Sequence, residues 1–459
     1  MQRNNLPDTA RHLHKSAAPV PTENKGNRGE IHMDELEEAR RKEREKDRKR
    51  EALRLKREEE LKKKFIRTGI IAAAVLLCVI LGVVSAVRFS KAKAAAAAAE
   101  KKKQQEAALE KEQQENIIDF LAVGDNIAHL GMRESGMRES GDWNYDAIYQ
   151  PVKEEVEAAD LALVTQETVF VEKREDISGY PAFGTPPEFG DALVNTGFDV
   201  VAHATNHILD KGTDSVAYTM RWWKEKHPDT QILGIHESQE DADTVTVVQC
   251  KALKLAMLDY TYGLNDIPLA EDKSYMIDVF DEGQARGDIK KAKELADVVI
   301  VVMHVGEEYV QDVDEQTRQW VNLFLEEGVD IVIGSHPHVI RTMETLTGED
   351  GHKMLVYYSL GNFTSTQNDL PSLLGAMAKI RIKKDVKTGA IQIPEHEFIP
   401  LLMHYNHDSR TYGIYKLDDY TQELADQHTA NERNPGEFSI SYYKDLFAQI
   451  KAKGNDDGI

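Results

Sequence analysis

Five short apolar runs in this sequence each end at a residue type that binds metal ions, and this pattern constrains the fold most strongly. The run at residues 329–333 leads into His336-Pro337-His338. Proline removes a ladder donor and holds the preceding residue extended, so the strand must end there and leave two imidazoles in a loop. The other runs cover residues 117–123, 161–164, 199–202 and 298–303, and they lead to Asp125, Glu167, Asn206 with His207, and His304.

The strand-end pattern predicts an α/β fold. In open α/β sheets the ligand crevice lies outside the carboxyl ends of the strands, so these scattered side chains are expected to converge. Helical patterns alternate with the apolar runs at residues 151–159, 188–196, 212–226 and 314–327. Such alternation favours sheets packed under helices. We expect this domain to span residues 117–402, with a C-terminal extension at residues 403–459 to which the sequence assigns no task.

Residues 68–87 contain no charged side chain and are rich in Ile, Ala, Val and Leu. Twenty residues of α-helix are about 30 Å long, which matches the hydrocarbon core of a bilayer. Core helices are normally shorter and keep some polar residues, while signal peptides have short leading regions, and here more than 60 residues precede the run. The segment is therefore predicted to be an uncleaved transmembrane helix.

The flanks of this segment are charged. Residues 1–33 lack apolar periodicity and are predicted to be a disordered tail, and residues 34–67 are predicted to form a solvated helix with i,i+4 charge pairs. Residues 88–116 are strong helix formers without an apolar stripe, typical of a semi-rigid stalk. Basic residues are denser before the apolar run than after it, so the N-terminus is predicted to be cytoplasmic and the main domain extracytoplasmic, at the cell membrane.

The charge distribution argues against nucleic acid as a partner. The chain has a net charge of −22, yet residues 1–67 hold 20 Lys and Arg against 14 Asp and Glu, so the main domain is strongly acidic. Nucleic-acid binding needs dense basic charge to displace counterions. The two cysteines, Cys78 in the apolar segment and Cys250, give no disulfide framework.

The converging side chains form a candidate metal site with two carboxylates, one amide and three imidazoles. The candidate ligands are Asp125, Glu167, Asn206, His304, His336 and His338. Mixed nitrogen and oxygen ligation suits Zn, Mn or Fe, and six ligands exceed the needs of one tetrahedral ion, so two divalent transition metals are predicted. His207 could then protonate a leaving group, with Asp210 orienting it.

The candidate ligands also have simpler structural interpretations. A single strand-terminal histidine is more often structural than a ligand, and His203 could equally pack beneath its loop. Asp125 and Asn126 follow Gly124 and would also suit a turn. Only the repetition at five strand ends favours a metal site.

The ordered motifs resemble those of CapA-type capsule proteins, which are membrane-anchored proteins linked to poly-γ-glutamate synthesis. The matching segments are Gly124 to Asn126, Asn206 to Gly212, His304 to Tyr309, His336 to His338 and Ser359 to Phe363. The resemblance implies a fold similar to calcineurin-like metallophosphoesterases, a sandwich of β-sheets flanked by helices.

The resemblance also implies roles for individual residues. Asp125 and His338 resemble first-metal ligands, Glu167 stands where phosphoesterases have a bridging aspartate, and Asn206, His304 and His336 resemble second-metal ligands, while His207 matches a proton donor. One departure is Ile127, which stands where phosphoesterases have a histidine; the alternatives are a metal with fewer ligands or the use of His129 in its place.

Two functions remain open from the sequence. One is an extracytoplasmic hydrolase acting on a phosphoester or an amide of an envelope polymer. The other is a noncatalytic metal-binding subunit that holds an anionic polymer or positions its synthase.

Overall fold

A computed structural model describes residues 33–455 of the chain. The chain divides into two compact units, Met1–Lys103 and Gln104–Ile459. The predicted tail at residues 1–33 lies outside the described residues except for Met33, which begins the first helix. Each unit is described on its own.

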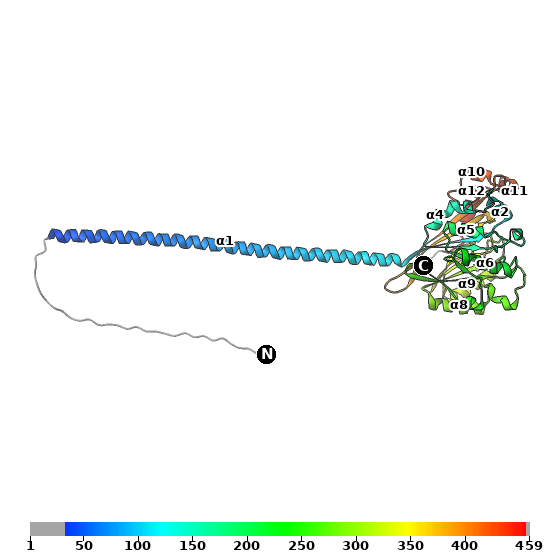
Figure 1. Ribbon diagram of the computed structural model, residues 1–459, viewed down its shortest axis with the longest axis horizontal. Coiled ribbons are helices and arrows are strands. Elements are labelled where there is room, and N and C mark those ends of the chain that lie inside the picture. The colour runs from blue at the N-terminus through cyan, green and yellow to red at the C-terminus, as the bar shows by residue number, and fades with distance from the viewer. Residues whose placement is uncertain (1–32, 456–459) are drawn as a thin grey trace, which may run out of the picture. The chain divides into compact units, whose positions relative to one another are not determined.

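One helix, α1 (Met33–Glu115), supplies all the described structure of the first unit (Figure 1). Ion pairs one turn apart join its charged side chains, as between Glu38 and Lys42 at 2.9 Å and between Glu45 and Lys49 at 3.1 Å. Farther along, its apolar side chains are exposed, including Ile70, Leu76 and Leu81. By length and composition, α1 contains a segment apolar enough to cross a membrane.

The second unit contains two β-sheets, and the larger has the strand order β14-β13-β12-β1-β2-β3-β4, with β11 paired to β1. Strands β1 to β4 are parallel, whereas β12, β13 and β14 are antiparallel to their neighbours. The strands are Ile117–Asn126 (β1), Leu161–Gln166 (β2), Val200–Ala202 (β3), Gln231–Leu233 (β4), Asn362–Thr364 (β11), Leu374–Lys384 (β12), Ile391–Asn406 (β13) and Thr411–Lys416 (β14).

The smaller sheet has the order β5-β6-β7-β8-β10-β9, and its central strands β6, β7, β8 and β10 are parallel. The strands are Thr246–Cys250 (β5), Leu253–Thr261 (β6), Val298–His304 (β7), Ile331–Ser335 (β8), Met343–Thr347 (β9) and Lys353–Tyr357 (β10). Strands β5 and β6 pair antiparallel, with Thr246 opposite Met257 and Cys250 opposite Leu253.

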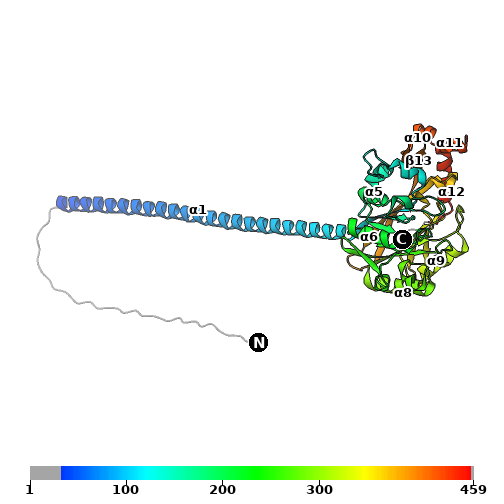
Figure 2. The same cartoon turned by 45° about the vertical axis from the view of Figure 1, so that its right-hand side comes forward.

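Helices cover the sheets. Figures 1 and 2 show α8 and α9 at one side of this unit and α10 to α12 at the other. The longer helices are Glu188–Thr196 (α5), Thr213–Lys226 (α6), Glu282–Leu295 (α8), Glu315–Glu327 (α9) and Ile440–Lys451 (α12). The shorter ones are Leu130–Ser135 (α2), Asp146–Tyr149 (α3), Lys153–Glu157 (α4), Gln239–Ala242 (α7), Gln422–Gln427 (α10) and Ala430–Arg433 (α11), with 3₁₀ turns at Gln150–Val152, Arg174–Asp176, Glu271–Met276 and Leu370–Leu373.

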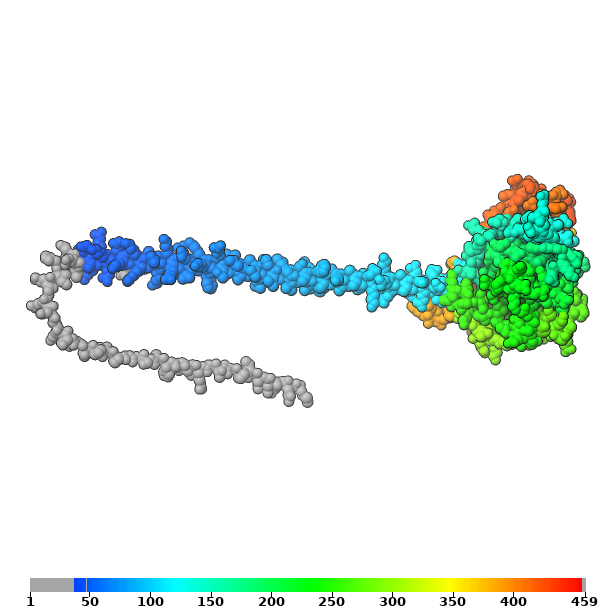
Figure 3. Space-filling view, viewed as in Figure 1, coloured from blue at the N-terminus to red at the C-terminus, as the bar shows by residue number. Residues whose placement is uncertain are grey.

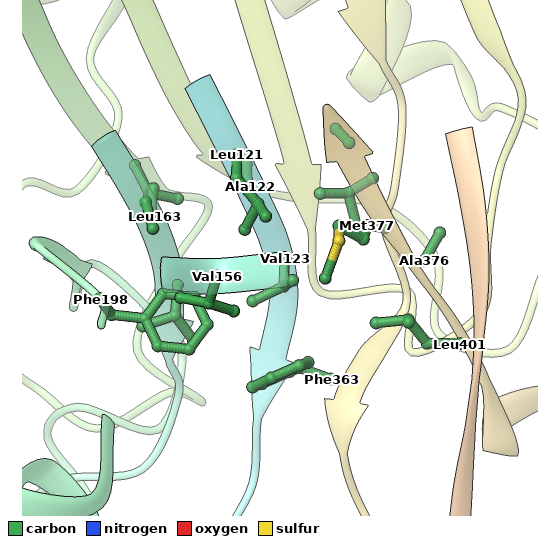
Figure 4. Packing of buried hydrophobic residues seen from close by; sticks show 14 of the residues in the cluster. Leu121, Ala122, Val123, Val156, Leu163, Phe198, Phe363, Ala376, Met377 and Leu401 are labelled. Carbon is green, nitrogen blue, oxygen red and sulfur yellow. The ribbon is translucent and has the colours of Figure 1, made fainter. Parts of the chain in front are cut away.

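The alternation along β7 explains how the layers hold together. Val298, Ile300 and Val302 belong to the apolar core that includes residues of both sheets, while Val299 and Val301 pack with residues of α8 and α9. Successive strand residues face opposite sides, so a strand buried on both faces must be apolar throughout. Figure 4 shows the same close packing around β1 in the larger sheet. The predicted sandwich of sheets flanked by helices is confirmed.

The C-terminal residues continue the larger sheet. Residue 402, the expected end of the domain, lies within β13, and β14 adds a further strand beyond it. Figure 3 shows this orange segment beside the teal surface of residues near 130–160. An ion pair between Lys416 and Glu155 joins the two segments.

Candidate metal centre

Strand ends from both sheets deliver the candidate ligands. Asp125 lies near the end of β1, Glu167 follows β2, and Asn206 and His207 follow β3, all in the larger sheet. In the smaller sheet, His304 ends β7, and His336 and His338 follow β8. The carboxyl ends of parallel strands share one edge of their sheet, which is why residues so far apart in sequence meet here.

Asp125, Glu167 and His304 form the first group of possible ligands. Each offers a ligand atom within 4.8 Å of the others, and all three side chains are buried. His304 Nδ1 lies 3.6 Å from Asp125 Oδ1. The end of β1 can approach the β11 turn closely because Gly124 has no side chain, since an added Cβ would lie 1.9 Å from the Gly361 carbonyl oxygen.

His336, His338 and Glu308 form the second group. The two histidines have φ angles of 94° and 58°, in the left-handed region that side chains other than glycine adopt at a cost of about 1 kcal/mol or more. Their loop is held by a hydrogen bond from the His336 amide to Asp125 Oδ2 at 3.0 Å. The sequence motif contained Glu308, but its role was not predicted, because it lies in a loop without periodicity after β7.

The two groups are adjacent, and His338 of the second group lies close to both carboxylates of the first. Its Nδ1 atom lies 3.6 Å from Asp125 Oδ2, and its Nε2 atom lies 3.8 Å from Glu167 Oε1. His304 lies in the group with Asp125 and Glu167, and its ring centroid is also 4.8 Å from that of His336, with which the family resemblance places it at one metal. Burial alone would lower the pKa of His338, but the charges of Glu167 and Asp125 raise it to about 9.

Several buried polar atoms in this cluster have no hydrogen-bond partner, which tests whether metal ions fit. Asp125 Oδ1, both carboxylate oxygens of Glu167 and His336 Nδ1 are all unpartnered. Burial raises the pKa of Glu167 to about 8. An unpartnered buried carboxylate is costly, whereas a divalent cation would satisfy it. The donor set of carboxylates and imidazoles therefore fits divalent transition metals.

Asn206 lies against the first group. Its Oδ1 atom is 2.8 Å from His304 Nε2, so the two atoms can bond to each other or face one ion. The Asn206 amide nitrogen donates to Asn265 Oδ1 at 3.0 Å, which fixes the orientation of the side chain. Ser335 Oγ lies 2.9 Å from the other nitrogen of His304.

His207 and Asp210 form a close pair at the side of the cluster. His207 Nδ1 lies 2.7 Å from Asp210 Oδ2, and His207 Nε2 lies 4.0 Å from Glu167 Oε1. Burial alone would lower the pKa of His207, but its hydrogen bond to Asp210 and the Glu167 charge raise it above its ordinary value. Asp210 Oδ2 also accepts from the Phe183 amide at 2.7 Å. The pair presents Nε2 of His207 toward the candidate ligand Glu167.

Three polar residues beside the candidate site make hydrogen bonds that indicate structural roles. His203 Nε2 accepts from the Trp223 indole at 2.9 Å, so His203 packs beneath the loop. Asn126 Oδ1 accepts from Tyr149 at 2.8 Å and from Thr364 at 2.6 Å, which gives Asn126 a structural role. His129 Nδ1 accepts from the Thr366 amide at 3.1 Å, and His129 belongs to neither ligand group.

A cavity of about 360 Å³ opens beside both ligand groups. Glu167, His207, Glu308 and His338 line it, and so does Ile127, which is buried. His129 lies against the same cavity, where burial lowers its pKa to about 3. A molecule in this space would contact the candidate ligands and His207 together.

The chain belongs to the family described as Bacterial capsule synthesis protein PGA_cap, whose match covers residues 119–367, more than half of the chain. This confirms the family predicted from the motifs. The chain is 28% identical to the PGA biosynthesis protein CapA of Bacillus subtilis (strain 168) over 227 residues, which are 47% of this chain and 56% of that protein. It is 27% identical to the capsule biosynthesis protein CapA of Bacillus anthracis over 180 residues, 38% of this chain and 42% of that protein. The chain therefore spans about half the length of these curated relatives.

Solved structures are more distant. The NAD nucleotidase of Haemophilus influenzae has a TM-score of 0.39 and 10% identity, covering 73% of this chain and 60% of that one. A sulfate thiohydrolase, SoxB, of Thermus thermophilus has a TM-score of 0.34 and 12% identity, covering 66% and 45%. Likeness at this level has no bearing on activity.

Proposed function

We propose that this chain is a membrane-anchored, extracytoplasmic metallohydrolase that takes part in the synthesis of an anionic capsule polymer such as poly-γ-glutamate. Family membership supports the capsule assignment, and the relatives carry names of capsule or PGA biosynthesis. Its partners would be the bilayer, through α1, and the polymer or its synthase. The strongly acidic main domain argues against nucleic acid.

One observation carries the hydrolase proposal: unpartnered, buried ligand atoms converge next to a cavity that also contains a proton donor. Asp125 Oδ1, the Glu167 carboxylate and His336 Nδ1 supply the unpartnered atoms. His207, fixed by Asp210, supplies the donor. A purely structural metal site would need no such donor, so the combination favours catalysis.

Two divalent metals, Mn, Zn or Fe, would be held by the predicted ligands together with Glu308. Bound metals of this kind supply Lewis-acid activation of water and of the scissile group. His207 Nε2 would give a proton to the leaving group, and Asp210 would hold the imidazole in the required tautomer. Asn206 would orient His304.

The experiment uses the full-length protein purified in a neutral detergent. Elemental analysis should find about two transition-metal ions per chain. Hydrolysis should then be measured with simple phosphodiesters and with γ-glutamyl oligomers. Turnover that disappears with a chelator and returns with metal supports the proposal, and metal-replete protein that cleaves no substrate of either class contradicts it.

The orientation requires its own test. Protease added to intact cells should remove residues 90–459 and leave residues 1–64, because the denser basic flank precedes the apolar segment. Digestion of the N-terminal residues with protection of the main domain would reverse the orientation.

A second candidate function is a noncatalytic metal-binding subunit of a polymer synthase. Ile127 favours it, since an apolar side chain stands where the resemblance leads one to expect a histidine ligand. In that case metal-ligand substitutions would stop polymer formation in cells, whereas His207→Ala would support it normally.

A further inference from the structure

The cavity beside the metal ligands contains groups that the hydrolase proposal leaves without a role. Its lining includes Tyr180, Phe183, Tyr309, Gln367, Asn368 and Asp369, and we call this part the outer part because Tyr180, Tyr309, Asn368 and Asp369 are exposed. These residues come from three loops that are far apart in the sequence. The cavity continues inward to Glu167, a fully buried residue whose carboxylate oxygens both lack hydrogen-bond partners. The outer part would therefore hold the portion of a substrate next to the scissile bond.

No lysine or arginine lines this cavity within residues 33–455. Sites that bind carboxylate or phosphate groups away from a metal normally use Arg or Lys, because these residues supply charge-assisted hydrogen bonds. Asp369 places a negative charge in the outer part instead. An anionic group there would meet repulsion from Asp369 unless the bound metal ions compensated its charge.

An aromatic wall leads outward from the His207 proton donor. The Phe183 ring packs edge-on against His207 at a centroid distance of 4.8 Å, and against Tyr180 at 6.4 Å. Tyr309 lies on the cavity as well, 5.8 Å from the His338 ring. Tyr180 is 79% exposed and Tyr309 is 47% exposed, so both rings remain available to a ligand. Aromatic faces attract cations and stack on apolar groups.

Asp369 is placed to complete a cation site. It precedes the 3₁₀ turn Leu370–Leu373, but its side chain makes no capping hydrogen bond, unlike Asp314 and Asp281 at the starts of α9 and α8. Within the described part of the chain, its carboxylate forms no ion pair. The carboxylate is thus free to pair with a positively charged ligand in the cavity that Tyr180 and Tyr309 also line.

We propose that the outer cavity binds an ammonium-bearing group, so that the bond cleaved beside it is an amide whose nitrogen leaves as an amine. This inference rests on the proposed hydrolase function. Hydrolysis would join the water oxygen to the carbonyl carbon and break the C–N bond, and the nitrogen would keep the electron pair. Both protons of the water would end on that nitrogen, one of them through His207, giving a carboxylate and an ammonium ion. Tyr180, Tyr309 and Asp369 would hold this ammonium product.

The test is a binding measurement that requires no turnover. Benzylamine, benzyl alcohol and benzoate have similar shapes and differ in charge, and ligand-observed NMR gives their dissociation constants with the metal-loaded, full-length protein in neutral detergent. Asp369→Asn should weaken benzylamine binding about two- to fivefold, the range for a partly exposed ion pair. It should leave benzyl alcohol unchanged and should not weaken benzoate, which can also bind the metals.

Matched variants provide the controls. Asp408→Asn removes an exposed carboxylate away from the cavity and should change none of the three affinities. Tyr180→Leu should weaken benzylamine, whereas Tyr180→Phe keeps the ring and should not. If benzylamine does not bind, or binds Asp369→Asn as tightly as the wild type, the inference is wrong.

The outcome is distinguishable from failure of the hydrolase proposal. If Asp369→Asn weakens benzylamine binding but the wild type hydrolyses no substrate, the amine site is supported and the hydrolase proposal fails. If the protein cleaves phosphodiesters in a chelator-sensitive reaction but does not bind benzylamine, the hydrolase proposal is supported and the amine site is excluded.

Discussion

Arg341 donates a hydrogen bond to the Asp314 carboxylate at 2.8 Å, although its own side chain is fully buried. The same guanidinium donates to the carbonyl oxygens of Val310 at 2.9 Å and Glu307 at 3.0 Å. Asp314 in turn accepts from the Thr317 amide and caps α9. Arg341 therefore ties the loop that carries Glu308 and Tyr309 to the start of a helix, and it positions one wall of the candidate site.

Asp314→Asn should destabilise the protein by about 3 kcal/mol, because it leaves the buried Arg341 charge without its partner. Burial opposes ionisation of Asp314, but the Thr317 amide and Arg341 lower its pKa to about 2. Because this folded-state pKa is depressed, the stabilisation is complete above the ordinary value near 3.8 and is lost as the pH falls toward 2. The free energy of unfolding, measured with denaturant between pH 2 and 6, should fall less toward low pH in the variant than in the wild type.

The control for this prediction is Asp312→Asn, which breaks the exposed ion pair between Asp312 and Lys453. Such pairs contribute little, so its unfolding curve should stay near that of the wild type. Equal loss of stability in both variants would contradict the role given to Arg341.

The strand-end ligands could be predicted from the sequence because their signal is local. An apolar run must stop where a polar residue or proline follows, and parallel strands bring such ends together. Glu308 and Asp369 gave no such signal, since both lie in loops whose positions depend on tertiary contacts. The burial of Arg341 could not be predicted either, because arginine residues are mostly exposed in folded proteins. The larger sheet continues through β14, past the expected boundary at residue 402, because the pairing of these strands is a tertiary contact without a local sequence signal.

Replacing His336 and His338 together by Ala should remove bound transition metal, since one loop presents both imidazoles to the candidate ligand groups. The melting temperature of the metal-loaded wild type should fall on chelation, whereas that of the double variant should not respond to chelator. His227→Ala, which removes an imidazole paired with Asp191 outside the site, is the control and should retain metal. Wild-type metal content in the double variant, measured by elemental analysis, would exclude these residues as ligands.

Asp259 is expected to act as a positioning residue. Its Oδ2 atom accepts from the amides of His203 at 2.9 Å and Ala204 at 2.7 Å, just before Asn206 in the chain. Asp259→Ala leaves the buried Ala204 amide unpaired, while the His203 amide keeps the Leu233 carbonyl oxygen as acceptor at 3.1 Å, and the change should cost about 1 to 3 kcal/mol. Turnover should fall while the KM of the substrate and the metal content change little.

Replacing Asp259 by Asn should preserve the positioning function of this residue. Burial raises the pKa of Asp259 well above its ordinary value, so an uncharged side chain with an acceptor oxygen is a close substitute. Asp259→Asn should therefore restore most of the turnover and stability lost in Asp259→Ala. If Asn were as damaging as Ala, the negative charge rather than the two hydrogen bonds would be the important property.

The sharpest separation of catalysis from binding comes from His207. If its Nε2 atom protonates the leaving group, His207→Ala should leave metal content nearly unchanged and reduce kcat by about 10² to 10⁴. The loss should be largest for substrates with basic leaving groups and small for nitrophenolate, which needs no proton. Asp210→Asn keeps the shape but alters the hydrogen bond to Nδ1, so it should cause a smaller loss with the same dependence on the leaving group. An equal loss for every leaving group would show that His207 positions the substrate or the loop and donates no proton.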